Sequence, residues 1–417
     1  MKKFLISLEQ TFTVVSLMVY SGTPLDALMT NGFTVKEGDR ILFRLFFTFT
    51  YIVSLALLTL RWKKATYVLS RDNFIWSLIG ICALSSFWSL DSDITTRRVI
   101  GLVGTTIFGI YLASRYTLKE QLKLCLLMLG ISAVMCFVFA LIMPQYGISG
   151  GESGAWRGIY PTKNVLGKRF FLSGAICLFL AITTRENRWA SWLLYVTSGV
   201  LILLSKSTTS LGNFIIITAA CLMYYRVLRL KYKVMIPVLT FIGTLGVAFY
   251  VWFVNAADTV LGAVGKDATL TGRTDLWPIV IEMIAKKPWL GYGYGAFWEK
   301  SSESSLIVQV VQWNAPNAHN GFLDLWLGLG LLGLLVFLIG FIVNFLRAIY
   351  LIRLDETYVN LWLLIYLTFI IFSNLTETTL VDQNSIEWIL YISAVFSSKI
   401  YTSANLQKWN QQTSYIV

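Results

Sequence analysis

Long apolar segments recur along this chain, separated by polar loops. A helix of about 20 apolar residues crosses a hydrocarbon layer ~30 Å thick, and most of these segments approach that length. Unpaired backbone groups are costly in lipid, and barrel strands would be about half as long with alternating polarity, so the pattern predicts helices. We recognise twelve segments, at residues 6–21, 41–60, 74–90, 98–114, 122–143, 168–183, 189–205, 209–225, 234–254, 319–346, 359–373 and 385–401.

The composition agrees with a membrane protein. The chain is 56% hydrophobic and only 13% charged, which leaves too little polar surface for a soluble protein of this size. The net charge of +12 is divided among many loops instead of forming a basic domain, and this argues against nucleic acid as a partner. The five cysteines fall inside apolar segments without metal-like spacing, as small buried hydrophobic residues do. We therefore predict an all-α, polytopic membrane protein of about 12 transmembrane helices, with residues 1–417 as a single membrane domain.

The placement of Lys and Arg predicts the orientation. Loops on the side of the N-terminus carry more than half of the 34 cationic residues, so both termini are predicted to be cytoplasmic. The other cations concentrate in two long outer loops, at 144–167 and 255–318. Positive charge kept on the outer face suggests an anionic ligand there.

The two outer loops differ in character. The first, 144–167, is rich in glycine, which permits turns and close backbone approach to a ligand. The second, 255–318, contains a stretch from Thr271 to Pro288 that predicts an amphipathic helix of about 12 residues, suited to lying on the membrane surface or on the helical domain. The following Gly-Tyr-Gly-Tyr-Gly run at 291–295 lacks the context of a dinucleotide fingerprint and indicates a turn or an aromatic anchor.

His319 is the single histidine, and it stands immediately before a long apolar segment. Histidine titrates nearer neutral pH than other side chains, so His319 is the leading candidate for a general base. We place it at the N-terminus of its helix, where the helix dipole favours the neutral imidazole. The alternative is an interfacial histidine that only bonds a loop carbonyl.

Cations of the outer loops could hold an anionic substrate. Arg157 and Lys163 lie in the first loop, and Arg273 lies in the second. Arginine pairs with phosphate oxygens in a bidentate manner, so two arginines could bind a diphosphate leaving group. Taken singly, each arginine could equally have a lipid headgroup or a carboxylate as its partner.

Other polar residues are weaker candidates. Asp91-Ser92-Asp93 is more typical of a helix cap than of a metal site for nucleotide-sugar chemistry. Glu377 and Asp382, near the outer end of a predicted span, could pair with an arginine, whereas Asp324 is interpreted as structural. Serine hydrolase chemistry lacks a nucleophile-elbow signature.

An ordered set of these segments resembles the superfamily of O-antigen ligases and exopolysaccharide polymerases. The resemblance covers about residues 85 to 380, and secondary likenesses occur at Phe87-Trp88-Ser89 and Asn374-Leu375-Thr376-Glu377. The main motifs are Trp156-Arg157-Gly158 to Lys163-Asn164-Val165-Leu166-Gly167, Gly272-Arg273-Thr274-Asp275-Leu276-Trp277 to Pro288-Trp289-Leu290-Gly291-Tyr292-Gly293, and Ala318-His319-Asn320-Gly321-Phe322-Leu323 with Gly328 to Gly333.

The resemblance implies a GT-C-like, metal-independent glycosyltransferase without a cofactor, in the bacterial inner membrane with its active site facing the periplasm. The donor would be a saccharide on undecaprenyl diphosphate, the acceptor a glycan, and a chain-length regulator a further candidate partner. His319 would deprotonate the acceptor hydroxyl. The implied diphosphate ligands are Arg157 and Arg273, joined by Lys163, and the supporting residues are Asn164, Asn320 and Glu377.

Three functions are compared. The first is a polymerase that joins undecaprenyl-diphosphate-linked repeat units into an exopolysaccharide or O-antigen chain, which the Lys163-Asn164 form of the first motif favours. The second is an O-antigen ligase that transfers a finished glycan to a lipid or protein. The third is a flippase of the lipid-linked sugar, for which elongation would not depend on His319.

Overall fold

The described part of the chain is helical. The computed structural model describes residues 2–22, 37–70, 72–149, 154–228, 230–231, 233–235, 237–238, 273–299, 302–311, 315–354 and 358–414, and within these its only β pairing is an isolated bridge between Ile148 and Trp156. The α-helices are α1 Lys2–Ser21, α3 Glu37–Thr59, α4 Trp62–Leu69, α5 Asn73–Leu84, α6 Ser92–Arg115, α7 Leu118–Ile142, α8 Pro144–Gly147, α9 Lys163–Thr183, α10 Arg188–Leu204, α11 Thr208–Val227, α13 Arg273–Lys286, α14 Ser302–Val311, α15 Gly321–Leu354, α16 Tyr358–Asn374 and α17 Ile386–Ser414.

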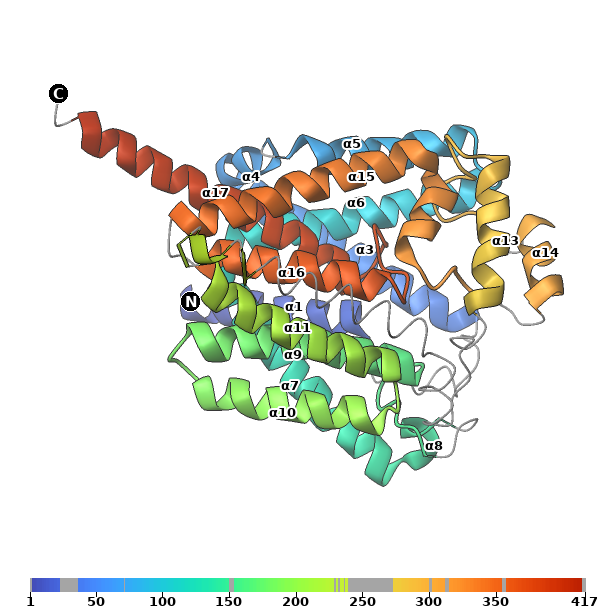
Figure 1. Cartoon of the computed structure of the whole chain (residues 1–417), viewed down its shortest axis with the longest axis horizontal. Helices are drawn as coiled ribbons and strands as arrows, with labels where there is room; N and C mark the ends of the chain where they lie inside the picture. The colour runs from blue at the N-terminus through green and yellow to red at the C-terminus, as the bar shows by residue number, and fades with distance from the viewer. Residues whose placement is uncertain are drawn as a thin grey trace.

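The long helices run side by side, and α13 and α14 cross one end of the bundle (Figure 1). We call this end the cap end. Both chain termini lie toward the opposite end, which we call the terminal end (Figure 1). The prediction that both termini are cytoplasmic stays a prediction.

Six helices in the described residues are long and apolar enough to cross a membrane, which identifies a multi-pass membrane protein. The helices α5, α10 and α16 are apolar but shorter. Eleven of the twelve predicted segments coincide with helices, and the twelfth, 234–254, lies almost entirely outside the described residues. The number of twelve spans stays a prediction. The six spans lie at 3–21, 41–59, 118–142, 163–183, 208–227 and 321–353.

Polar residues in the loops begin several helices. Asp72 and Asp91 accept hydrogen bonds from the amides of Ile75 and Ile94, at the N-termini of α5 and α6. Asp91 therefore acts as the cap that the sequence suggested. Thr117 and Glu120 form a reciprocal capping box at the start of α7.

The helix α9 occupies the centre of the bundle, packed by α7, α10, α11 and α16. Most of its side chains are buried, among them Arg169. The Arg169 guanidinium contacts the carboxylate of Glu387 at the start of α17 and donates from Nε to the carbonyl of Ser21 at the end of α1 (2.5 Å). This ion pair joins three helices inside the bundle.

The helices α13 and α14 and the start of α15 share a second apolar core. Leu276, Val280, Met283 and Ile284 of α13 are buried in it. The predicted amphipathic helix therefore exists, and its apolar face lies against the protein, one of the two surfaces proposed for it. The cap end is thus a packed structure that closes over one side of the bundle.

The glycine-rich run after α13 makes a close turn against α15 and the loop before α6. Gly293 and Gly295 have positive φ angles of 98° and 70°. A Cβ on Gly293 would lie 2.2 Å from the Ser89 hydroxyl, so only glycine fits there. The predicted turn is confirmed, and it brings the segments 85–90 and 288–295 together.

Candidate functional site

His319 lies at the cap end, in the loop that leads into α15. Its backbone is left-handed, with a φ of 49°, and α15 begins two residues later, at Gly321. Asn320 caps the helix, because its side-chain oxygen accepts from the amides of Phe322 (3.0 Å) and Leu323 (3.2 Å). The sequence therefore placed His319 slightly too close to the helix: the histidine precedes the cap and is not in the first turn.

The partly buried carboxylate of Asp324 fixes the position of this loop. It accepts hydrogen bonds from the backbone amide of Ala318 (3.0 Å), the indole of Trp298 (2.7 Å) and the hydroxyl of Thr378. Ala318 is the chain neighbour of His319, and Thr378 is the chain neighbour of Glu377. One carboxylate thus ties together two segments that are more than 50 residues apart in the sequence.

His319 and Glu377 face each other across this junction. The His319 Nδ1 atom lies 3.9 Å from the Glu377 Oε2 atom, and the two side chains are 19% and 21% exposed. This distance is too long for a hydrogen bond, but the carboxylate forms an ion pair with the imidazole when the imidazole is protonated and so favours that form. Both side chains also remain accessible from outside.

The motifs that carry His319 and Glu377 also pack directly on one another. The Asn374 side chain accepts from the amide of Thr379 (2.8 Å) and thereby folds the turn that holds Glu377. A Cβ on Gly321 would lie 2.2 Å from the Asn374 side-chain oxygen, which explains why glycine follows Asn320.

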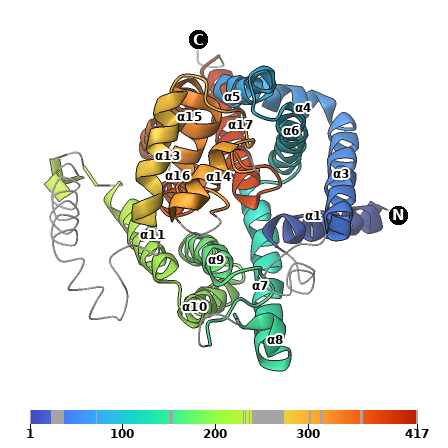
Figure 2. The same ribbon diagram turned by 90° about the vertical axis from the view of Figure 1, so that its right-hand side faces the viewer.

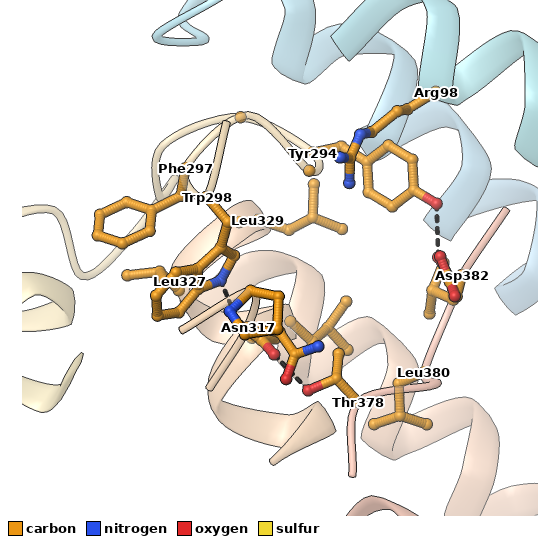
Figure 3. Close-up of a pocket in the computed structure, with 17 residues that line it drawn as sticks. Arg98, Tyr294, Phe297, Trp298, Asn317, Leu327, Leu329, Thr378, Leu380 and Asp382 are labelled. Carbon is orange, nitrogen blue, oxygen red and sulfur yellow. Dashed lines mark hydrogen bonds between the residues drawn. The ribbon is translucent and has the colours of Figure 1, made fainter. Parts of the chain in front are cut away.

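A cavity of about 170 Å³ lies beside the two segments that carry this pair, and Asn317 and Thr378 line it. Figure 3 shows Arg98 of α6, Trp298, Asn317, Thr378 and Asp382 around it. Ligand pockets for small molecules usually exceed about 300 Å³, so this cavity is too small for an oligosaccharide. It is better suited to a few water molecules.

Asp382 contributes a second carboxyl group to this region. Asp382 is exposed at the surface, and desolvation by the neighbouring protein raises the pKa of its carboxyl to about 6. The positive charges of Arg98 and Lys168 oppose that rise in pKa.

Arg157 lies in the first outer loop and is almost completely buried, with 3% of its surface exposed. The guanidinium donates to the carbonyl groups of Gln145 (3.3 Å) and Pro161 (3.5 Å), while its Nε atom has no acceptor in the described part of the chain. Burial lowers the pKa of Arg157, yet an arginine stays protonated at neutral pH. The loop therefore holds a fixed positive charge with an unused donor.

Lys163 and Asn164 form the first turn of α9, beside this loop. The Asn164 side-chain oxygen accepts from the Ser207 hydroxyl (3.4 Å), which connects α9 to the start of α11. Lys163 is half-buried.

Arg273 begins α13, but its side chain lies outside the described residues. One helical turn later, the indole of Trp277 donates to the carbonyl of Ala318 (2.9 Å). This hydrogen bond attaches the first turns of α13 to the loop of His319. The backbone of Arg273, one helical turn before Trp277, therefore lies near that loop.

The predicted site is thus assembled in part. The structure joins His319 with Glu377 and attaches the start of α13 to their loop. The hydrogen bonds of Arg157 stay within its own loop, and among the described residues it makes no polar contact with His319.

The buried ion pair of Arg169 with Glu387 and the anchoring contacts of Asp324 could not be predicted from the sequence patterns above. The sequence does contain one indication for Arg169, because a charged residue inside an apolar helix generally has a charged or polar partner. The sequence contains no indication of the contacts of Asp324, because its partners Trp298 and Thr378 are distant in the sequence.

Comparisons with known proteins agree with this architecture. The chain is a multi-pass helical membrane protein with a polar site at one end of its bundle. A family model described as O-antigen ligase matches residues 193–338, which include Arg273 and His319. The exopolysaccharide production protein ExoQ of Rhizobium meliloti (strain 1021) is 26% identical over 356 residues, covering 80% of this chain and 71% of that protein. Both matches support the superfamily of O-antigen ligases and ExoQ-type exopolysaccharide production proteins as the group that this chain resembles.

Proposed function

We propose that this protein is a polysaccharide polymerase that joins undecaprenyl-diphosphate-linked oligosaccharide units at the cap end. The observation that carries the proposal is the approach of His319 Nδ1 to Glu377 Oε2 at 3.9 Å, in a partly open position. A general base needs an orienting partner and access to its substrate, and this pair has both.

The proposed reaction is a displacement at an anomeric carbon. A hydroxyl of the acceptor glycan attacks this carbon, and the bond between the carbon and the diphosphate oxygen breaks with inversion. His319 takes the hydroxyl proton, while the diphosphate departs with the bonding electrons. Glu377 stabilises the imidazolium that forms.

Arg157 and Arg273 are proposed to bind the departing diphosphate, with Lys163 as a third cation. The fixed positive charge of Arg157 supports this assignment, because a charge that is already in place stabilises a departing diphosphate without reorganisation. A lipid diphosphate is already a good leaving group, so charge stabilisation and positioning can supply most of the catalysis. We therefore propose a reaction independent of metal and cofactor.

Polymerisation is preferred to ligation because the relative across most of this chain is named for exopolysaccharide production. The O-antigen ligase description of the family model keeps transfer of a finished glycan as the alternative. In both reactions His319 and the arginines would have the same roles.

A reconstituted assay tests this proposal. Purified protein in nanodiscs is supplied with lipid-linked repeat units, and the products are separated by length. A ladder of products indicates a polymerase, whereas products that appear only after a second acceptor is added indicate a ligase. His319→Ala should lower either activity about 10²- to 10⁴-fold, as expected for loss of a general base. A ladder of normal yield from this variant would contradict the catalytic proposal, and the absence of any product from the wild type with either acceptor would favour a flippase.

The proposed location is the bacterial inner membrane, with the termini in the cytoplasm and the cap end in the periplasm. The position of both termini at one end supports this orientation (Figure 1). Reporter fusions at residue 417 and within 144–167 should be active on opposite sides of the membrane. Activity of both reporters on the same side of the membrane would exclude this orientation.

A further inference from the structure

A second, larger groove lies at the cap ends of α3 and α6, on the far side of the bundle from α8 and α10 (Figure 2). Its volume is about 530 Å³, within the range of ligand pockets. Three arginines line it: Arg44 of α3, and Arg97 and Arg98 of α6.

The charge of this groove is strongly positive. Arg98 pairs with Glu299 (2.6 Å), which is the sole acidic residue among those lining the groove. Arg44 is exposed, and the Arg97 Nε donates only to the backbone carbonyl of Asp93 (3.2 Å). Two guanidinium groups therefore face the groove without a carboxylate partner in the described part of the chain, a combination suited to a multiply charged anion.

Part of the remaining wall is apolar and continues into a surface suited to lipid. Phe43, Phe47 and Ile100 line the groove beside the arginines. On α3, apolar side chains such as Leu45 (63% exposed) and Ile52 (63% exposed) point away from the protein. An occupant with a doubly charged head and a long apolar tail would satisfy both parts.

The groove is also connected to the candidate site. Gln383 and Asn384 line it, and they belong to the same short segment as Glu377, between α16 and α17. Arg98 lines both the groove and the smaller cavity beside the segment that carries Glu377. An occupant of the groove would therefore lie next to the candidate site, on the other side from the loop of Arg157.

We infer that this groove binds the polyprenyl diphosphate of the acceptor chain, while the Arg157 loop serves the donor. The inference rests on the proposed function, because a polymerase must hold two lipid-linked glycans at once and only one of them loses its diphosphate. Arg44 and Arg97 hold the diphosphate that stays intact. No bond of the acceptor lipid breaks in the groove.

Photocrosslinking tests this inference. The full-length protein in phosphatidylcholine nanodiscs is labelled with a diazirine-bearing polyprenyl diphosphate, and the labelled peptides are mapped by mass spectrometry. Label is expected on α3 and α6 as well as near Arg157. The double variant Arg44→Gln/Arg97→Gln should lose α3 and α6 labelling about tenfold, as expected for two lost charge-assisted contacts, and keep the label near Arg157.

The control variant Arg185→Gln/Arg188→Gln removes the same charge at the terminal end, and it should label like the wild type. A tenfold excess of phosphatidylglycerol should not compete. Equal labelling of α3 and α6 in the arginine variant, or full competition by phosphatidylglycerol, overturns the inference.

The outcome is separable from that of the proposed function, because labelling requires no turnover. His319→Ala protein should label α3 and α6 normally although it elongates chains only at a residual rate. Absence of label from α3 and α6 in an actively elongating wild-type protein would overturn the assignment of the groove to the acceptor lipid and leave the proposed function intact.

Discussion

Two pairs of charged side chains show the difference between the interior of this bundle and its cap end. Arg169 and Glu387 are in direct contact, with side chains 11% and 1% exposed. Arg169 also donates to the Ser21 carbonyl, and the Glu387 carboxylate accepts from the Ser385 hydroxyl. His319 and Glu377 lie 3.9 Å apart, and about a fifth of each remains exposed. The interior pair is closed and fixed, whereas the cap-end pair retains the access that proton transfer requires.

The comparison indicates that burial with complete bonding marks a structural ion pair. A buried charge without its partner is strongly destabilising, so the interior pair is retained for folding. An accessible pair contributes little to stability and is better explained by chemistry.

The largest effect is expected for the interior pair. Arg169→Leu leaves the Glu387 carboxylate buried without its cation, and loss of one partner of a buried pair costs about 3–5 kcal/mol. We expect the folded yield and the melting temperature to fall sharply, as measured by size-exclusion chromatography and thermal unfolding in detergent. The double variant Arg169→Met/Glu387→Leu should recover much of the loss. If Arg169→Leu did not destabilise the protein, the distinction between a structural interior pair and a functional cap-end pair would be lost.

The next effect is expected at Asp324, which positions the two cap-end segments. Asp324→Asn exchanges one acceptor oxygen for a donor, so it cannot accept from Ala318, Trp298 and Thr378 together. We expect kcat for elongation to fall about 10- to 100-fold with a small change in KM, because misplacement of a catalytic group by ~1 Å has an effect of this size.

A matched control for Asp324 is Trp298→Phe, which removes one bond to the same carboxylate without touching the loop of His319. It should reduce kcat much less. If both variants lost the same activity, Asp324 would be stabilising the cap end as a whole.

The smallest of these effects is expected for Glu377→Gln, which keeps the shape of the side chain and removes its charge. We expect elongation to slow about tenfold, since Glu377 orients the base without reacting. A carboxylate favours the protonated imidazole, so its removal should move the acid limb of the pH–rate profile to lower pH. A limb that moved to higher pH or did not move would exclude the electrostatic role.

The sequence was sufficient for the helices and insufficient for their contacts. The apolar runs at 168–183 and 319–346 predicted α9 and α15, and helix periodicity predicted α13 with its buried Leu276 and Val280. These features are local, because a helix and its apolar face repeat within a few residues.

The candidate site depended on contacts between distant segments. The sequence provided His319 and Glu377, but their approach requires Asp324 to bind Thr378 and Gly321 to accommodate Asn374. The joint placement of Arg157, Arg273 and His319 stays a prediction, since the Arg273 side chain lies outside the described residues.

The central claim is that His319 and Glu377 act as one unit in transferring the acceptor proton. A double-mutant cycle on the elongation rate measures this directly. Glu377→Gln should slow the wild type about tenfold and have no further effect in the His319→Ala background, because the carboxylate then has no imidazole to orient. Equal slowing by Glu377→Gln in both backgrounds would show that the two residues act independently and would contradict the account.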